Sequence, residues 1–244
     1  MCKGPVPTGG LVGFLSGNFS DNTWRDEYLG VNATVTNGEK RVPNGLTFKG
    51  SGAGAVWPVG DMGQTVPYYF ANNKFTLVAT VSIHEVPQSD SSIPLMGVRM
   101  NDTKGTVLFG LSYTHEKKWL AITEDAVDAE DFDGAEDVGD IVKWETNRTY
   151  QVGLQMDSEE WSVFVEGKEI NYTEYNTSLF NTHRILHFYI GGDSKDRSAT
   201  GSHVTVTNVM LYNEWLLNDT LRKLNANKVT IPSLGVEKNP TEQV

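Results

Sequence analysis

The acidic stretch between residues 124 and 140 holds the side chains best suited to bind a metal ion. It contains nine acidic residues, and Asp131–Gly134 follows the spacing of part of a calcium-binding loop. In an EF-hand frame, however, position one would be Ala129 and position twelve Asp140, and no helical pattern flanks the loop. So many charges and so few large apolar residues indicate a solvated loop. We therefore predict no bound metal and no cofactor.

The five histidines offer a second pattern for metal binding. His183 and His187 are four residues apart, a spacing that gives one shared face only on a helix, whereas this segment is predicted to be a loop that enters a strand. His84, His115 and His203 are isolated in the sequence. We interpret all five as ordinary polar or core residues.

Catalytic carboxylates and nucleophiles are not arranged in a known pattern. Sandwich glycosidases project carboxylates from alternate positions of one strand, but Glu124, Glu130 and Glu136 are each followed two residues later by an apolar residue. There is no Gly-x-Ser-x-Gly turn, and Cys2 lies in an aperiodic N-terminal segment. The glycine run Gly50–Gly54 precedes no helical pattern, so it is not expected to hold phosphate. We predict that the chain is not an enzyme.

Tryptophan side chains are the residues best suited to contact a sugar, because they combine a large apolar face with a polar edge. Trp161 alternates with valines and is predicted to be buried, whereas Trp215 could be accessible. A carbohydrate-binding module therefore stays open as an alternative function. The six tryptophans are Trp24, Trp57, Trp119, Trp144, Trp161 and Trp215.

The apolar periodicity predicts an all-β protein that positions these side chains. Phe75–Ile83 alternates between apolar and polar residues, as do Tyr150–Met156 and Trp161–Val165. About ten to twelve strands without βαβ alternation predict a single antiparallel β-sandwich over residues 9–216. The other expected strands include Leu11–Leu15, Val31–Val35, Leu46–Phe48, Leu95–Met100, Val107–Tyr113, Trp119–Ile122 and Ile185–Ile190.

The two ends of the chain lack the strand pattern of residues 9–216. Residues 1–8 contain two prolines and no periodicity, which indicates a tail or the end of a linker. In residues 217–244, leucines at i, i+4 and i+7 predict one short C-terminal helix, with Asn218 or Asp219 as its N-cap, followed by an extended tail.

The stretch His203–Asn213 is predicted to be a long core strand rich in β-branched residues. Val204 and Val206 share one face of a regular strand, but Val209 and Leu211 fall on the other. Either a bulge near Asn208 restores a single apolar face, or both faces are buried. In sandwiches of this type the first strand, Leu11–Leu15, is expected to pair with this one.

The same strand carries a resemblance. Val204–Asn213 resembles the Val-Thr-Val-x-Asn-Val-x-Leu-Tyr-Asn signature of the trypanosome sialidase/trans-sialidase superfamily, and Gly9–Leu15, Leu46–Phe70 and Phe188–Asp193 resemble other parts of that family's C-terminal lectin-like domain. The similarity covers roughly Gly9–Leu216. It implies a concanavalin A-like jelly roll from a surface glycoprotein, without the catalytic propeller and its Asp boxes.

By this resemblance, the domain attaches the parasite to host cells or matrix. The family usually carries Arg after Tyr-Asn, and Glu214 stands there instead, which should weaken binding to an acidic host surface by ~1–3 kcal/mol. An adhesion surface should expose Tyr212 and Asn213, whereas a structural buttress should bury the motif and expose an apolar patch. The signature residues are Val204, Thr205, Val206, Asn208, Val209, Leu211, Tyr212 and Asn213.

The charge and composition of the chain limit the classes of partner and the cellular location that we expect. The net charge of −11 disfavours nucleic acid and anionic membranes, leaving a host surface or matrix protein, with glycans as a second class. No apolar run reaches the ~18 residues of a membrane span, no signal or anchor sequence is present, and we expect a monomer. Seven glycosylation sequons, where chance gives roughly three, indicate a secreted or cell-surface glycoprotein fragment. They lie at Asn18, Asn32, Asn101, Asn147, Asn171, Asn176 and Asn218.

Overall fold

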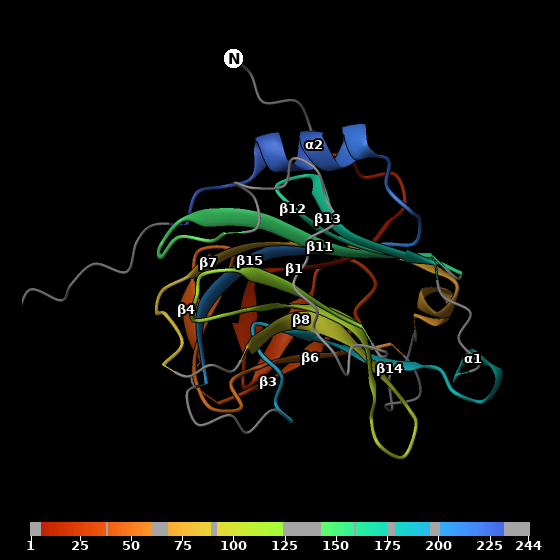
Figure 1. Cartoon of the computed structure of the whole chain (residues 1–244), viewed down its shortest axis with the longest axis horizontal. Helices are drawn as coiled ribbons and strands as arrows, with labels where there is room; N and C mark the ends of the chain where they lie inside the picture. Colours follow the sequence, from red (N-terminus) through yellow and green to blue (C-terminus); the bar gives the residue numbers. More distant parts are fainter. Residues whose placement is uncertain are drawn as a thin grey trace, which may run out of the picture.

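The computed structural model describes residues 6–37, 39–59, 68–88, 92–123, 143–158, 160–174, 179–195 and 201–231. The acidic stretch 124–140, Cys2, Asn176 and the predicted tail after Ile231 lie outside these residues. Alternating apolar residues give a β-sandwich of two packed layers, with a helix outside one of them (Figure 1). The predicted all-β, antiparallel, jelly-roll-like architecture is confirmed.

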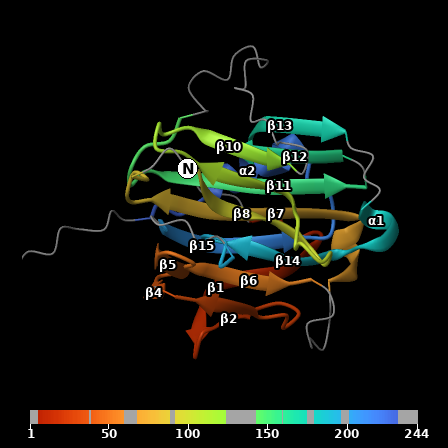
Figure 2. The same ribbon diagram turned by 60° about the horizontal axis from the view of Figure 1, so that its bottom comes forward.

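Fifteen strands form one continuous antiparallel sheet that folds over on itself. One layer runs β10-β9-β8-β14-β6-β3, and the sheet turns through β2 into β1-β15-β7-β11-β12-β13 (Figure 2). The strands of the first layer are β3 (Ala33–Thr36), β6 (Gly54–Pro58), β8 (Ile93–Met100), β9 (Val107–Tyr113), β10 (Trp119–Thr123) and β14 (Ile185–Ile190).

The second layer contains the longest strands and the signature. Its strands, with the connecting β2 and the side pair β4–β5, are β1 (Leu11–Ser20), β2 (Thr23–Asp26), β4 (Glu39–Val42), β5 (Gly45–Gly50), β7 (Lys74–Ile83), β11 (Thr149–Asp157), β12 (Glu160–Val165), β13 (Lys168–Glu174) and β15 (Ser202–Tyr212). The helices are η1 (Tyr69–Asn72), α1 (Leu179–Thr182) and α2 (Asn218–Asn227).

Aromatic rings join the two layers in the core. Phe75 of β7 lies 5.0 Å from Phe188 of β14, and Phe109 of β9 stacks at 5.0 Å on Trp161 of β12, both between ring centroids. Such pairs contribute roughly 0.5–1.5 kcal/mol beyond the area they bury. The predicted burial of Trp161 is confirmed, since it is 1% exposed.

A second, smaller apolar cluster lies on the outer face of the β7–β11–β15 layer, under α2. Leu221 and Leu224 of the helix pack there with Val78, Met210 and Tyr212 of the sheet, and the blue helix crosses above this layer in Figure 1. The part of the layer under α2 is therefore covered on both faces, which explains why polar residues of its strands, such as Thr76 and Gln155, are buried.

Two details differ from the sequence prediction. The expected ten to twelve strands omitted the short strands β2, β4 and β6. The predicted N-cap of α2 is wrong: the cap is Leu217, without a side-chain hydrogen bond, and Asn218 is the first helical residue. Within the described chain, no helix has the length and apolar character needed to cross a bilayer.

Candidate functional site

The signature strand β15 lies in the middle of its layer. Val206 is paired with Leu46 of β5 on one side and with Val81 of β7 on the other. Farther along, Val209 is paired with Leu15 of β1. The predicted pairing of the first strand with this one is therefore confirmed, and the backbone of β15 is flanked by strands along most of its length.

A bulge interrupts the strand at Asn208, as predicted. The register with β7 shifts between Thr207 and Met210, Asn208 has φ 49°, and its N–H donates to the Asn44 carbonyl at 3.0 Å. Asn tolerates this left-handed conformation better than most residues. The shift puts Val204, Val206, Val209 and Leu211 in the main core, while Met210 and Tyr212 face α2. Both explanations offered for the phase slip therefore hold.

Six of the eight signature side chains are buried. Val204, Thr205, Val209, Leu211 and Tyr212 are 0% exposed and Val206 is 1% exposed. Asn208 is half-buried, and Asn213 is exposed. Tyr212 does not have the exposure that an adhesion surface would require, because the cluster under α2 encloses its ring and its hydroxyl donates to the Pro7 carbonyl at 3.0 Å. This burial raises the pKa of Tyr212.

The buried hydroxyl of Thr205 belongs to a polar network. Its Oγ1 lies 2.7 Å from Thr47 Oγ1 and 2.7 Å from His84 Nε2, and His84 Nδ1 lies 2.6 Å from Asn147 Oδ1. With Nδ1 donating to the amide oxygen, Nε2 accepts from Thr205 and the imidazole is neutral. Burial, as the main cause, lowers the pKa of His84.

A second histidine stands beside this network. The centroid of the His203 ring lies 5.1 Å from that of the His84 ring. The Nδ1 atom of His203 is 2.6 Å from Glu85 Oε1, and the same carboxylate oxygen forms an ion pair with Lys49. A small polar cavity of about 150 Å³ opens next to His203, Glu85 and Tyr113. Sequence reasoning missed this pair because strands β7 and β15, far apart in the chain, bring its members together.

His183 and His187, whose spacing of four residues we interpret as no metal site, lie in a loop and in the strand that follows it. His187 is buried in β14, where burial lowers its pKa to about 4, and His183 lies in the preceding turn. Among the described residues, no three His, Cys, Asp or Glu side chains are grouped so that they could hold a metal ion.

An apolar cavity of about 370 Å³ opens beside the bulge. It lies between α2, β1 and β15, and its walls include Leu11, Phe14, Asn208, Met210 and Leu224. The signature residue Asn208 and the neighbouring Met210 of β15 both line this cavity.

The tryptophans do not form an exposed platform for a sugar. Five of them are at most 4% exposed: Trp24, Trp57, Trp119, Trp144 and Trp161. Trp215, which follows the signature, is half-buried. A sugar stacked on a tryptophan face is therefore not supported by the described residues.

The sequons are distributed over several loops and strands. Asn18, Asn101 and Asn218 are exposed, and Asn32, Asn147 and Asn171 are half-buried. Asn32 and Asn101 also accept backbone hydrogen bonds through Oδ1, from Asp26 N at 2.9 Å and Arg184 N at 2.8 Å. Their glycosylation stays a prediction.

Comparison with known proteins supplies the family. A model described as the C-terminal domain of trans-sialidase matches residues 7–219. A Trypanosoma cruzi sialidase is 41% identical over 78% of this chain, and Sialidase 85-1.1 of the same organism is 32% identical over 95% of it. The chain spans only 15% and 30% of the length of these two relatives.

Solved structures of sialidases have the same fold as this chain. The sialidase of Trypanosoma rangeli in complex with 2,3-difluorosialic acid superposes with a TM-score of 0.77 at 41% identity, over 92% of this chain and 34% of that one. The same sialidase in complex with sialic acid gives a TM-score of 0.76 at 42% identity, over 91% and 33%. The chain belongs to the trypanosome sialidase and trans-sialidase family, and it corresponds to the C-terminal domain of those proteins.

Proposed function

We propose that the chain is a non-catalytic accessory domain of a trypanosome sialidase-like surface glycoprotein, and that its signature strand is the structural centre of this domain rather than its contact surface. The observation that carries the proposal is the burial of six of the eight signature side chains. A side chain that is enclosed on every side contributes to stability, but it reaches a partner only if the domain opens. The apolar cavity beside Asn208 and Met210 fits the buttress function, since a domain that supports another one needs an apolar face for it.

Host-cell attachment is the second candidate, and it rests on the end of the same strand. Asn213 and Glu214 are exposed there. Because the chain carries a net charge of −11, a neutral or cationic host surface would suit this end better than an acidic one. If the domain attaches to host cells, its contact with them is limited to the last residues of the signature and their neighbours.

Binding to cultured mammalian cells separates the two candidates. The chain would be produced through a eukaryotic secretory pathway and compared with the surface variant Asn213→Ala/Glu214→Ala. Under the structural proposal, any cell binding is the same for both proteins. Saturable binding that the double change abolishes, in a protein of unchanged melting temperature, would overturn it in favour of attachment.

Tyr212→Phe is the matched control on the buried side of the strand. It keeps the ring and removes the hydroxyl that donates to Pro7, so it should lower stability without altering cell binding. The mass of the secreted protein before and after enzymatic removal of N-glycans checks the glycoprotein part. An unchanged mass would contradict a surface glycoprotein.

A further inference from the structure

A large cavity lined by described residues opens at one end of the sandwich, away from the signature strand. It has a volume of about 770 Å³, within the roughly 300–1,000 Å³ of typical small-molecule sites. Three segments border it: the β9–β10 turn with Lys117, residues 143–148 before β11, and the β12–β13 turn with Glu166. Segments that are far apart in sequence therefore form one cavity wall.

The inner part of the cavity consists of buried, rigid side chains. Trp144, Tyr150 and Val165 are each at most 3% exposed. Trp144 packs edge-on against Tyr113 at 5.6 Å between ring centroids, and the Tyr150 hydroxyl accepts from Glu145 N at 2.7 Å. The Arg148 guanidinium lies 5.1 Å above the Tyr150 ring, which limits where its charge can point. The wall is therefore set before any ligand arrives.

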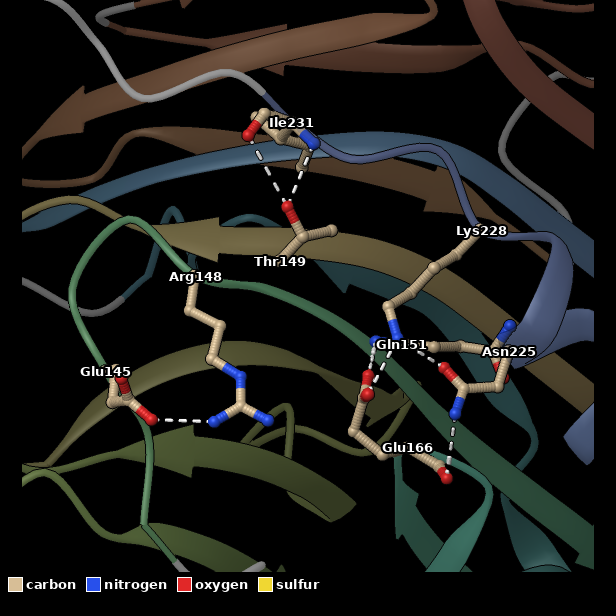
Figure 3. A network of polar contacts seen from close by, with 8 residues as sticks. All are labelled: Glu145, Arg148, Thr149, Gln151, Glu166, Asn225, Lys228 and Ile231. Atoms are coloured by element: carbon tan, nitrogen blue, oxygen red, sulfur yellow. Dashed lines mark hydrogen bonds and ion pairs between the residues drawn. The ribbon is translucent and has the colours of Figure 1, made fainter.

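Among the described residues that line the rim, four cations face three carboxylates. Its three carboxylates already have cationic partners: Glu116 pairs with Lys118, Glu145 with Arg148 and Glu166 with Lys228, at 2.9, 2.6 and 2.6 Å (the last two in Figure 3). By contrast, the ammonium groups of Lys117, Lys143 and Lys168 have no ion-pair partner among the described residues. The Arg148 guanidinium bonds to Glu145 through Nη1 only, so its other nitrogens are not used in that ion pair.

The backbone of the rim contributes to its shape as well. Outside Asn and Asp, the described non-glycine residues with φ in the left-handed region are Lys117 (63°), Ser158 (55°) and Glu166 (55°). Two of these three border the cavity. Both lie in hairpin turns, where a left-handed φ is the usual geometry, so the two turns hold this part of the rim in a fixed shape.

We propose that this cavity binds a small acidic saccharide, whose carboxylate or sulfate is held by Arg148 and the three lysines. A planar guanidinium next to flexible ammonium groups matches an oxyanion. The second carboxylate oxygens of Glu116 and Glu145 can accept hydrogen bonds from ring hydroxyls, and Val165 and the aromatic edges meet the apolar face of the ring. A ligand with an oxyanion, hydroxyls and an apolar face is an acidic sugar.

The charge of the whole chain sets the strength of this site. A net charge of −11 repels an anion at long range, so affinity must come from the local donors and should fall steeply as salt rises. Binding is then expected to be weak for one sugar unit. The site is independent of the signature strand, and its failure would leave the structural proposal unchanged.

Three monosaccharides of the same ring test the proposal on the full chain: glucuronic acid, glucose 6-sulfate and glucose. Saturation-transfer NMR would measure binding at concentrations up to about 10 mM. We expect at least one of the acids to bind at least about tenfold more tightly than glucose. Binding of the carboxylate alone, the sulfate alone or both identifies the oxyanion. No binding of either acid, or equal binding of all three sugars, overturns the proposal.

Two variants locate the binding. Arg148→Gln/Lys168→Gln removes two rim cations and should weaken the acid at least about tenfold. Arg222→Gln/Lys223→Gln removes the same charge from the exposed face of α2 and should leave affinity within about twofold. If Arg148→Gln alters folding, Lys168→Gln alone, on an exposed side chain, provides the comparison. Equal weakening by the control pair would show a general charge effect and would overturn the assignment to this cavity.

Discussion

His84 Nε2 lies 2.7 Å from Thr205 Oγ1. The contact joins the histidine that follows β7 to the centre of the signature strand, inside the protein. Because Thr205 also contacts Thr47 at 2.7 Å and His84 also contacts Asn147 at 2.6 Å, four segments of the chain share one buried chain of hydrogen bonds. A network of this kind stabilises the fold only while every member keeps its partner.

Replacing His84 should therefore destabilise the domain. In His84→Ala the buried Thr205 side chain and the half-buried Asn147 side chain each lose a partner, and the free energy of unfolding should fall by about 2–3 kcal/mol. Urea unfolding followed by tryptophan fluorescence measures the change. His183→Ala, in the turn before β14, is the control and should stay within about 0.5 kcal/mol of wild type. A His84 variant as stable as this control would show that the network adds nothing.

His187 makes the stability depend on pH. Burial, together with the charges of Lys195 and Arg99, lowers its pKa to about 4, against the opposing influence of Asp193. The unfolded chain binds the proton near pH 6.5, so the stability from the neutral, buried ring is complete above that pH. It is lost progressively as the pH falls toward about 4, up to ~3 kcal/mol.

Unfolding curves between pH 4 and pH 7 check this dependence. His187→Gln cannot take up the proton, so its stability should fall less over the same range than that of wild type. The lowered pKa of His84 acts in the same direction in both proteins, and the difference between the two curves isolates His187. Parallel curves would rule out this histidine as the source.

The sequence predicted the strand and its bulge, but not what covers it. Alternation fixes which residues of β15 share a face, and the phase slip at Asn208 places the bulge. Whether the outer face meets solvent depends on α2, which packs on Met210 and Tyr212 after a separate turn. The exposure of Tyr212 therefore could not be derived from the strand alone. The pairing of His84 with His203 was hidden for the same reason, because it needs the register of β7 with β15.

Val206 tests the strand as a structural centre. It is 1% exposed and packs in the main core, so Val206→Ala should cost about 2 kcal/mol through lost burial and a residual cavity. Asn213→Ala, at the exposed end of the same signature, should cost less than about 0.5 kcal/mol. Thermal and urea unfolding of the two variants give the comparison. Similar small losses for both would mean that the strand is not part of the rigid core.

Gly45 is required by the close approach of β5 to β15. A Cβ at this position would lie 2.0 Å from the Val206 carbonyl oxygen, so one of the paired backbones would have to move. Gly45→Ala should cost more than about 3 kcal/mol or prevent folding. Gly9→Ala, where an added Cβ meets no atom within 4 Å, should fold as wild type does. A Gly45 variant with the melting temperature of the Gly9 variant would contradict the register described here.

Glu166 is expected to hold the C-terminal helix on the sheet. Its Oε1 accepts from Gln151 N at 2.7 Å, its Oε2 pairs with Lys228 at 2.6 Å, and its carbonyl accepts from Asn225 Nδ2 at 3.0 Å (Figure 3). The Glu166 and Lys228 side chains are only 23% and 20% exposed, so their attraction is less screened than that of a surface pair.

Glu166→Ala should therefore lower stability by about 1.5–3 kcal/mol and speed amide hydrogen exchange in α2 more than in β7. Asp219→Ala removes an ion pair of the same helix that spans 3.6 Å between exposed side chains and should change stability by less than about 0.5 kcal/mol. The double variant with Lys228→Ala should cost less than the sum of the single changes, because the first change already removes the shared contact. Additive losses, or unchanged exchange in α2, would show that the helix is held by its leucines alone.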